Sequence, residues 1–181
     1  MKKTMTALVF AFVLSPLGAL SLSAGIDAAS HLSFAYGTTG VSGEAAVQID
    51  GHLRTTLGIG WYSTGDYSDD VRLANLALGA DYFPFEDIGL YVGVSLADVF
   101  FPYGLDGDGK VRFSNHLRLG YAWNLPGTTL DLRVNLRDLV SASASDAYYL
   151  SSRIGQLGRI SFTCLVSFRY DFASTSQEEM Q

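Results

Sequence analysis

The chain has 181 residues, of which 48% are hydrophobic and 17% are charged, and its formal net charge is −6. This apolar content excludes an intrinsically disordered chain, because too much apolar surface must be buried, and the length favours one domain. The negative charge argues against a nucleic-acid-binding domain, which needs a basic face. With one cysteine, Cys164, the chain has neither an internal disulfide framework nor a zinc ribbon.

The N-terminal segment has the layout of a secretory signal peptide. Lys2 and Lys3 precede an apolar stretch over residues 6–19, and small residues follow at 20–25. We therefore predict a signal peptide over residues 1–24, cleaved near Ala24, with Ser21 and Ser23 as alternative ends. A retained N-terminal membrane helix is the competing interpretation, against which Pro16 argues. No run of 18 apolar residues follows residue 24.

The rest of the chain alternates apolar and small or polar residues with a period of two, which is typical of strands. This pattern predicts eight strands, two of them weaker, near residues 32–36, 45–49, 53–62, 75–82, 90–97, 116–123, 130–137 and 159–172. Tight turns alternate with longer loops, as in an up-and-down meander. We expect an all-β fold, a single eight-stranded antiparallel transmembrane β-barrel over residues 25–172, and a polar C-terminal tail over residues 173–181.

The polar face of these strands predicts which side points inward. It carries Gly, Ser, Thr, Asn and Arg, with almost no Lys or Glu, and therefore suits the crowded lumen of a small barrel better than bulk water. The lumen-lining polar residues that we expect are Arg54, Asp81, His116, Arg118, Asp131, Arg133, Arg137, Arg159 and Arg169. An ion-pair network that fills the lumen is the simplest interpretation, and an arginine-lined constriction for small anions or water is the alternative.

The apolar face ends in aromatic residues, as expected where strands meet the two lipid–water interfaces. This interfacial girdle comprises Tyr36, Trp61, Tyr82, Tyr121, Trp123, Tyr170 and Phe172. Aromatic residues in two long loops are candidate contact residues, namely Phe100, Phe101, Tyr103, Tyr148 and Tyr149. Several strands reach the 9–11 residues that a tilted strand needs to cross a bilayer.

Residues from about 29 to 172 resemble the small outer-membrane barrels of the type shared by OmpX, OmpW and the OmpA membrane domain. The last strand ends Phe168-Arg169-Tyr170-Asp171-Phe172, which is similar to the aromatic-ended signal that the barrel assembly machinery recognises, although nine residues follow it. The resemblance implies an outer-membrane location, contact with outer-membrane lipids, and that machinery as a partner during biogenesis.

Candidate chemistry is sparse. Ser114 and His116 share one face, and Glu44 or Asp131 could orient the histidine. Ser114 and His116 both fall on the lumen-facing side of the strand pattern, which favours a hydrogen-bonding role over catalysis. Asp106 and Asp108 lie in a loop without the further ligands of a calcium site. Cys164 has lipid-facing parity and is expected to be inert. We therefore predict no catalytic residues, no metal and no cofactor.

The expected function is that of a non-enzymatic outer-membrane barrel. It would give narrow passage to small or hydrophobic solutes, present surface loops for interactions, or both. The expected partner is a small or apolar solute. An open general porin is unfavourable, because side chains fill an eight-stranded lumen. Two alternatives are a membrane-embedded lipid-modifying barrel enzyme and a soluble periplasmic lipid-binding barrel of the lipocalin type.

Overall fold

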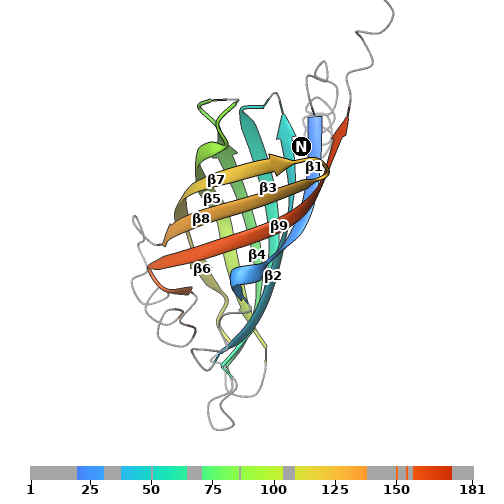
Figure 1. The fold of residues 1–181 in the computed structure, drawn as a ribbon. Helices are drawn as coiled ribbons and strands as arrows, with labels where there is room; N and C mark the ends of the chain where they lie inside the picture. The colour runs from blue at the N-terminus through green and yellow to red at the C-terminus, as the bar shows by residue number, and fades with distance from the viewer. Residues whose placement is uncertain are drawn as a thin grey trace, which may run out of the picture.

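The computed structural model describes residues 20–30, 38–49, 51–64, 71–85, 87–103, 109–137, 150, 154 and 157–172. They form one antiparallel sheet (Figure 1). Its strands are β1 (Leu20–Asp27), β2 (Thr39–Ile49), β3 (Leu53–Ser63), β4 (Arg72–Tyr82), β5 (Leu90–Pro102), β6 (Arg112–Ser114), β7 (His116–Leu125), β8 (Thr128–Arg137) and β9 (Ile160–Phe172). The described part of the chain has no helix that is long and apolar enough to span a membrane.

The sheet closes on itself. Its strand order is β4-β3-β2-β1-β9-β8-β7-β5-β6, and a further pairing joins β4 to β5. Strands β6 and β7 are separated only by Asn115, and both pair with β5, so together they form one interrupted strand. The predicted fold class is confirmed as a closed, all-antiparallel, eight-stranded barrel. Closure leaves the paired backbone with no open edge.

The first strand differs from the prediction. β1 begins at Leu20 and pairs with β2 on one side and with β9 on the other. The predicted cleavage site near Ala24 falls inside this strand. The reason is visible in the sequence, because Leu20, Leu22 and Ala24 alternate with small polar residues, which fits a strand as well as a cleavage region. The predicted strand at 32–36 lies outside the described residues.

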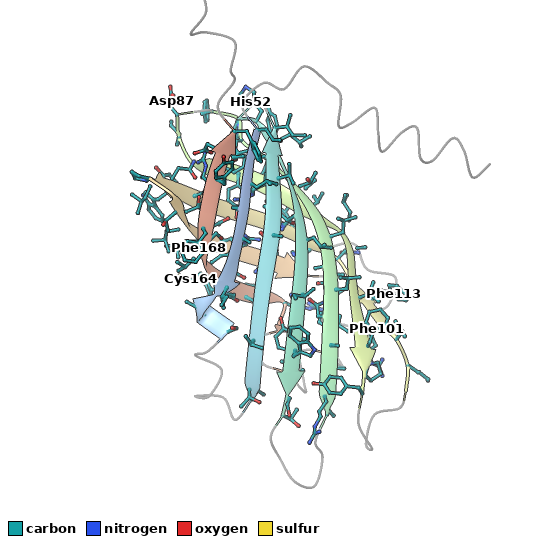
Figure 2. All side chains as sticks on the ribbon, turned by 90° about the vertical axis from the view of Figure 1, so that its right-hand side faces the viewer. His52, Asp87, Phe101, Phe113, Cys164 and Phe168 are labelled. Carbon is teal, nitrogen blue, oxygen red and sulfur yellow. The ribbon has the colours of Figure 1, made fainter. Side chains whose placement is uncertain are left out.

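Period-two alternation separates an apolar outer face from a polar lumen. Every strand contributes at least one large apolar residue that is exposed on the outside, for example Leu22, Val41, Leu57, Leu78, Val92, Phe113, Leu119, Leu132 and Phe168. Figure 2 shows Phe113 and Phe168 among these outer side chains. Charged residues such as Arg54 and Asp131 are buried inside. The barrel is therefore apolar where a soluble protein would normally be polar.

A β-bulge in β5 corrects the prediction for Phe100. Gly79 pairs with Ser95 and Leu78 pairs with Ala97, so Leu96 is an extra residue in β5. The bulge shifts the later residues of β5 by one position, which turns Asp98 and Phe100 toward the lumen. Phe100 is fully buried and is not a loop contact residue. The sequence suggested a loop here because β5 was expected to end near residue 97.

Candidate functional site

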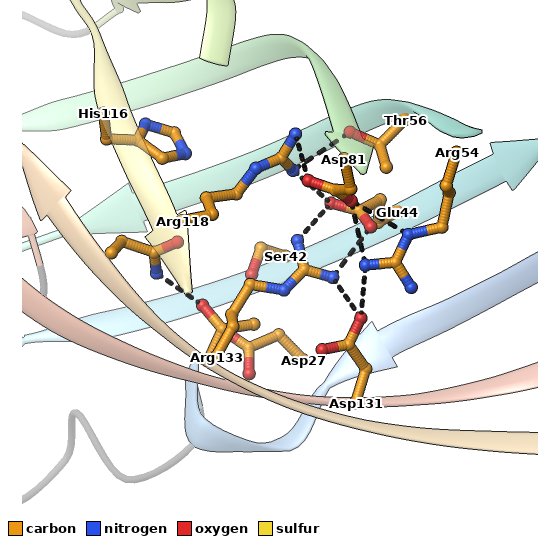
Figure 3. A network of polar contacts seen from close by, with 12 residues as sticks. Asp27, Ser42, Glu44, Arg54, Thr56, Asp81, His116, Arg118, Asp131 and Arg133 are labelled. Carbon is orange, nitrogen blue, oxygen red and sulfur yellow. Dashed lines mark hydrogen bonds and ion pairs between the residues drawn. The ribbon is translucent and has the colours of Figure 1, made fainter. Parts of the chain in front are cut away.

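Six charged side chains form a closed ring of alternating charge across the lumen (Figure 3). In order around this charge ring they are Arg54, Asp81, Arg118, Glu44, Arg133 and Asp131. They come from strands β2, β3, β4, β7 and β8. Only the contact between Arg118 Nη1 and Glu44 Oε2 is long, at 3.6 Å, whereas the other contacts range from 2.8 to 3.0 Å. The ring ties together strands that are distant in the sequence.

The strongest geometry in the charge ring joins Arg133 to Glu44. Nη1 and Nη2 of Arg133 donate to the two carboxylate oxygens of Glu44 at 2.8 and 2.9 Å. Arg133 also donates to Asp131 at 3.0 Å, and the Tyr91 hydroxyl donates to the other oxygen of Asp131 at 2.7 Å. Two-pronged pairing of this kind fixes both position and orientation. The buried charges are therefore held by neighbours of opposite sign, as burial requires.

Glycines on the lumen face give the charge ring its space. A Cβ at residue 79 would collide with the guanidinium of Arg118, and a Cβ at residue 93 would collide with the carboxylate of Asp81. The Cβ of any side chain at residue 120 would likewise collide with the ring of Tyr91. The lumen of an eight-stranded barrel is just wide enough for side chains, so large residues on some strands require glycine opposite them.

An aromatic layer lies next to the charge ring, toward the end of the barrel that carries the tight turns. Phe83 and Tyr91 are buried there with ring centroids 5.0 Å apart. The guanidinium of Arg54 lies over both rings, 4.4 Å from the Tyr91 centroid and 5.1 Å from the Phe83 centroid. These cation–π contacts join the aromatic layer to the charge ring.

A second polar group, the Asp98 cluster (Asn75, Asp98, His116 and Arg137), lies toward the end with the long loops. Asp98 accepts from Arg137 at 2.7 Å, lies 3.3 Å from His116 Nδ1 and also accepts from Asn75. Asp98, and not the expected Glu44 or Asp131, is therefore the carboxylate beside His116. Ser114 lies nearby and accepts from Arg137 at 3.4 Å.

A cavity of about 560 Å³ separates these two polar groups. Its lining includes Glu44, Arg118 and Arg133 on one side and Asp98, His116 and Arg137 on the other.

Beyond the Asp98 cluster, an apolar cluster fills the long-loop end of the lumen. It comprises Tyr62, Val71, Leu73, Phe100, Leu150, Ile154 and Leu157. Three of these residues, Leu150, Ile154 and Leu157, lie between β8 and β9 in the sequence and are buried.

Asp27 is a lumen residue that sequence reasoning missed. It ends β1, and its carboxylate accepts from the backbone N–H groups of Ala29 and Cys164, each at 3.0 Å. The pairing of β1 with β9 ends at Asp27 and Leu165, and Cys164 is the β9 residue just beyond that end. The side chain of Asp27 therefore binds a strand donor at the point where β1 stops, which satisfies a group that would otherwise lack a partner in the barrel wall.

The other predicted polar residues lie nearer the rims. Arg159 is exposed just before β9 and is not buried in the lumen, although its carbonyl oxygen accepts from the Arg137 N–H. Arg169 is half-buried and pairs at 2.6 Å with the exposed Asp171. The alternation along β9 predicted that both side chains face the lumen. Both lie near an end of the strand, where the rim of the barrel is open to solvent.

The girdle residues that the structure describes lie near the ends of the strands. Trp61, Tyr82, Trp123, Tyr170 and Phe172 are exposed, and Tyr121 is half-buried against Trp123, with centroids 4.4 Å apart. Phe101 and Tyr103 are exposed at the long-loop end, where Figure 2 shows Phe101 near Phe113. The predictions for Tyr36, Tyr148, Tyr149, Asp106 and Asp108 fall outside the described residues.

The charge ring holds three arginines and three carboxylates, so its formal charge is zero. This balance disfavours the alternative of an anion-selecting constriction, because every guanidinium in the ring is paired with carboxylates. Across the described ranges, no three metal-binding side chains come close enough together to hold an ion.

Comparisons with known proteins assign no family. No family model and no curated protein matches the chain. Among solved structures, the chain is similar to one described as "De novo design of transmembrane beta-barrels", with 12% identity, a TM-score of 0.40, and coverage of 87% of this chain and 98% of that one. This likeness is too distant to select among small barrel families.

Proposed function

We propose that this chain is an integral outer-membrane β-barrel protein. One observation carries the proposal, namely that a closed barrel presents large apolar side chains outward on all its strands while it buries charged residues inside. In water this arrangement would expose an apolar belt and bury charge, which is unfavourable on both faces. In a bilayer the belt contacts acyl chains and the closed backbone needs no water.

Expression of the full chain in a Gram-negative host tests this location. We expect the protein in the outer-membrane fraction, extractable only with detergent, with different gel mobility before and after boiling. Protease added to intact cells should cut only in the long loops. A monodisperse protein in buffer without any amphiphile would refute the proposal and would favour a soluble barrel, although that alternative needs an apolar lumen, unlike the charged one here.

Within the membrane, we propose that the protein acts through its long-loop end and without enzymatic chemistry. The charge ring, the Asp98 cluster and the loop-end apolar cluster fill successive levels of the lumen, which supports a barrel that is closed to hydrated solutes. Phe101, Tyr103 and Phe113 present exposed aromatic surface at the same end, where a partner or an apolar solute could bind. Ser114 and His116 face the lumen and are away from lipid, which supports a structural role for both.

Narrow solute passage is the second candidate, and it is favoured by the cavity of about 560 Å³ that side chains leave between the charge ring and the Asp98 cluster. Conductance in planar bilayers separates the two candidates. A closed barrel should show no channel events, and Arg133→Ala should introduce them by removing the two-pronged pair with Glu44. Regular conductance in the wild-type protein would instead establish passage and would contradict the closed-lumen proposal.

A further inference from the structure

The position of β1 bears on where the exported chain is processed. β1 is the strand that closes the barrel, because it pairs with β2 through Leu20–Ile26 and with β9 through Leu20–Asp27. Cleavage after Ala24 would remove five of its eight residues. Residues 168–172 of β9 and 45–49 of β2 would then lose the partner that lies between them. An open edge of that length is not tolerated in a bilayer.

Two local features show that β1 is built for this position. A Cβ at residue 25 would collide with Ser167 and with the carbonyl oxygen of Val166, so only glycine allows β1 to approach β9 in this register. Two residues later, the carboxylate of Asp27 accepts from the Cys164 N–H where the pairing ends. Both features lie in the part of β1 that all three candidate bonds would leave in the folded chain, so they fix the register of β1 against β9 and do not choose among the bonds.

We propose that the leader is removed at the Ser21–Leu22 bond. This inference rests on the proposed export to the outer membrane. Leader peptidases require small residues one and three positions before the bond, and here these are Ser21 and Ala19. The Ala24 bond places Leu22 at the third position, which is unfavourable. Hydrolysis consumes one water, leaves a carboxylate on Ser21 and frees the α-amino group of Leu22.

The Ser21–Leu22 bond also costs the barrel least among the three candidates. It leaves six of the eight β1 residues, whereas cleavage after Ser23 leaves four and cleavage after Ala24 leaves three. Leu22 pairs with Tyr170, so the new α-ammonium would lie at the level of the interfacial aromatic residues. An α-ammonium on Gly25 would lie roughly 10 Å further along the strand, toward the apolar middle of the barrel.

N-terminal sequencing of the full-length gene product, purified from the outer membrane, tests the bond directly. We expect Leu22 as the first residue. Ala24, Gly25 or any other first residue in a membrane-inserted protein would overturn the inference while leaving the proposed function intact. A soluble product would overturn both.

Processing kinetics provide a second test that does not depend on folding. In a pulse-chase experiment, Ala19→Leu should make the precursor accumulate, because it places a large residue three positions before the proposed bond. Ser23→Leu is the matched control and should leave processing unchanged, since it blocks only the bond after Ser23. The reverse pattern would refute the proposed bond.

A cross-link tests whether β1 holds its register in the exported protein. In a Cys164→Ser background, Ala24→Cys with Phe168→Cys should form a disulfide, because these residues are direct partners. Ala24→Cys with Tyr170→Cys is the control, two residues out of register, and should form much less. Absence of the first cross-link in the inserted protein would contradict the inference.

Discussion

Replacing Asp81 with asparagine tests whether the charge ring stabilises the barrel. Asp81 is 1% exposed, accepts from Arg54 Nε at 2.9 Å, and forms ion pairs with Arg54 Nη2 at 2.8 Å and with Arg118 Nη2 at 3.0 Å. Asparagine keeps the shape but removes the charge, which leaves the ring with an excess positive charge away from water. Removing one partner of a buried ion pair typically costs about 3–5 kcal/mol, so we expect a loss of that size in the free energy of unfolding.

Urea unfolding of the protein in detergent micelles measures this loss, with the fluorescence of Trp61 and Trp123 as the signal and gel mobility without boiling as a second readout. Asp171→Asn is the matched control, because it removes the same charge from an exposed pair with Arg169. Exposed pairs contribute at most about 1 kcal/mol, so the control should change the free energy of unfolding very little.

A double variant shows whether the cost arises from the unbalanced charge. Asp81→Asn combined with Arg118→Met restores neutrality, and we expect it to be less destabilised than the sum of the two single variants, by about 0.5–3 kcal/mol. If Asp81→Asn matches Asp171→Asn within error, or if the two single effects simply add, the charge ring does not stabilise the barrel in the way that we infer.

Two further predictions concern the lumen and the outer face. Gly120→Ala should displace Tyr91 and destabilise the barrel, whereas Gly58→Ala, whose Cβ would meet only ordinary contacts, should not; urea midpoints compare them, and equal midpoints would refute the steric argument. Leu132→Arg, on the outer face in the middle of β8, should cost about 2–4 kcal/mol in lipid vesicles, whereas Leu125→Arg at the end of β7 should cost about 0–1 kcal/mol. Equal costs would indicate that the outer face does not contact the hydrocarbon.

Alternation in the sequence was enough to predict the fold, because a period of two separates the two faces of each strand without any knowledge of its neighbours. It could not predict partners across the lumen. Arg133 and Glu44 are 89 residues apart, and parity places both inside but does not bring them together. The strand order and register create that contact, and they depend on the closed barrel as a whole.

Alternation also fails where one residue is inserted. The bulge at Leu96 shifts the face on which later residues of β5 lie, and a strict period of two therefore places Asp98 and Phe100 on the wrong side. No local signal marks the bulge, because Leu96 and Ala97 are ordinary strand residues and both are exposed. This is why sequence reasoning missed the carboxylate that lies beside His116.

The charge ring limits where the function of this barrel can lie. A balanced ring in which each arginine contacts two carboxylates has little tendency to attract a charged solute, and opening it would separate several buried pairs at once. Such a ring contributes mainly to joining strands, and any solute path must either break it or avoid it. The parts of the described chain left for recognition are therefore the cavity beyond the ring and the aromatic surface at the long-loop end.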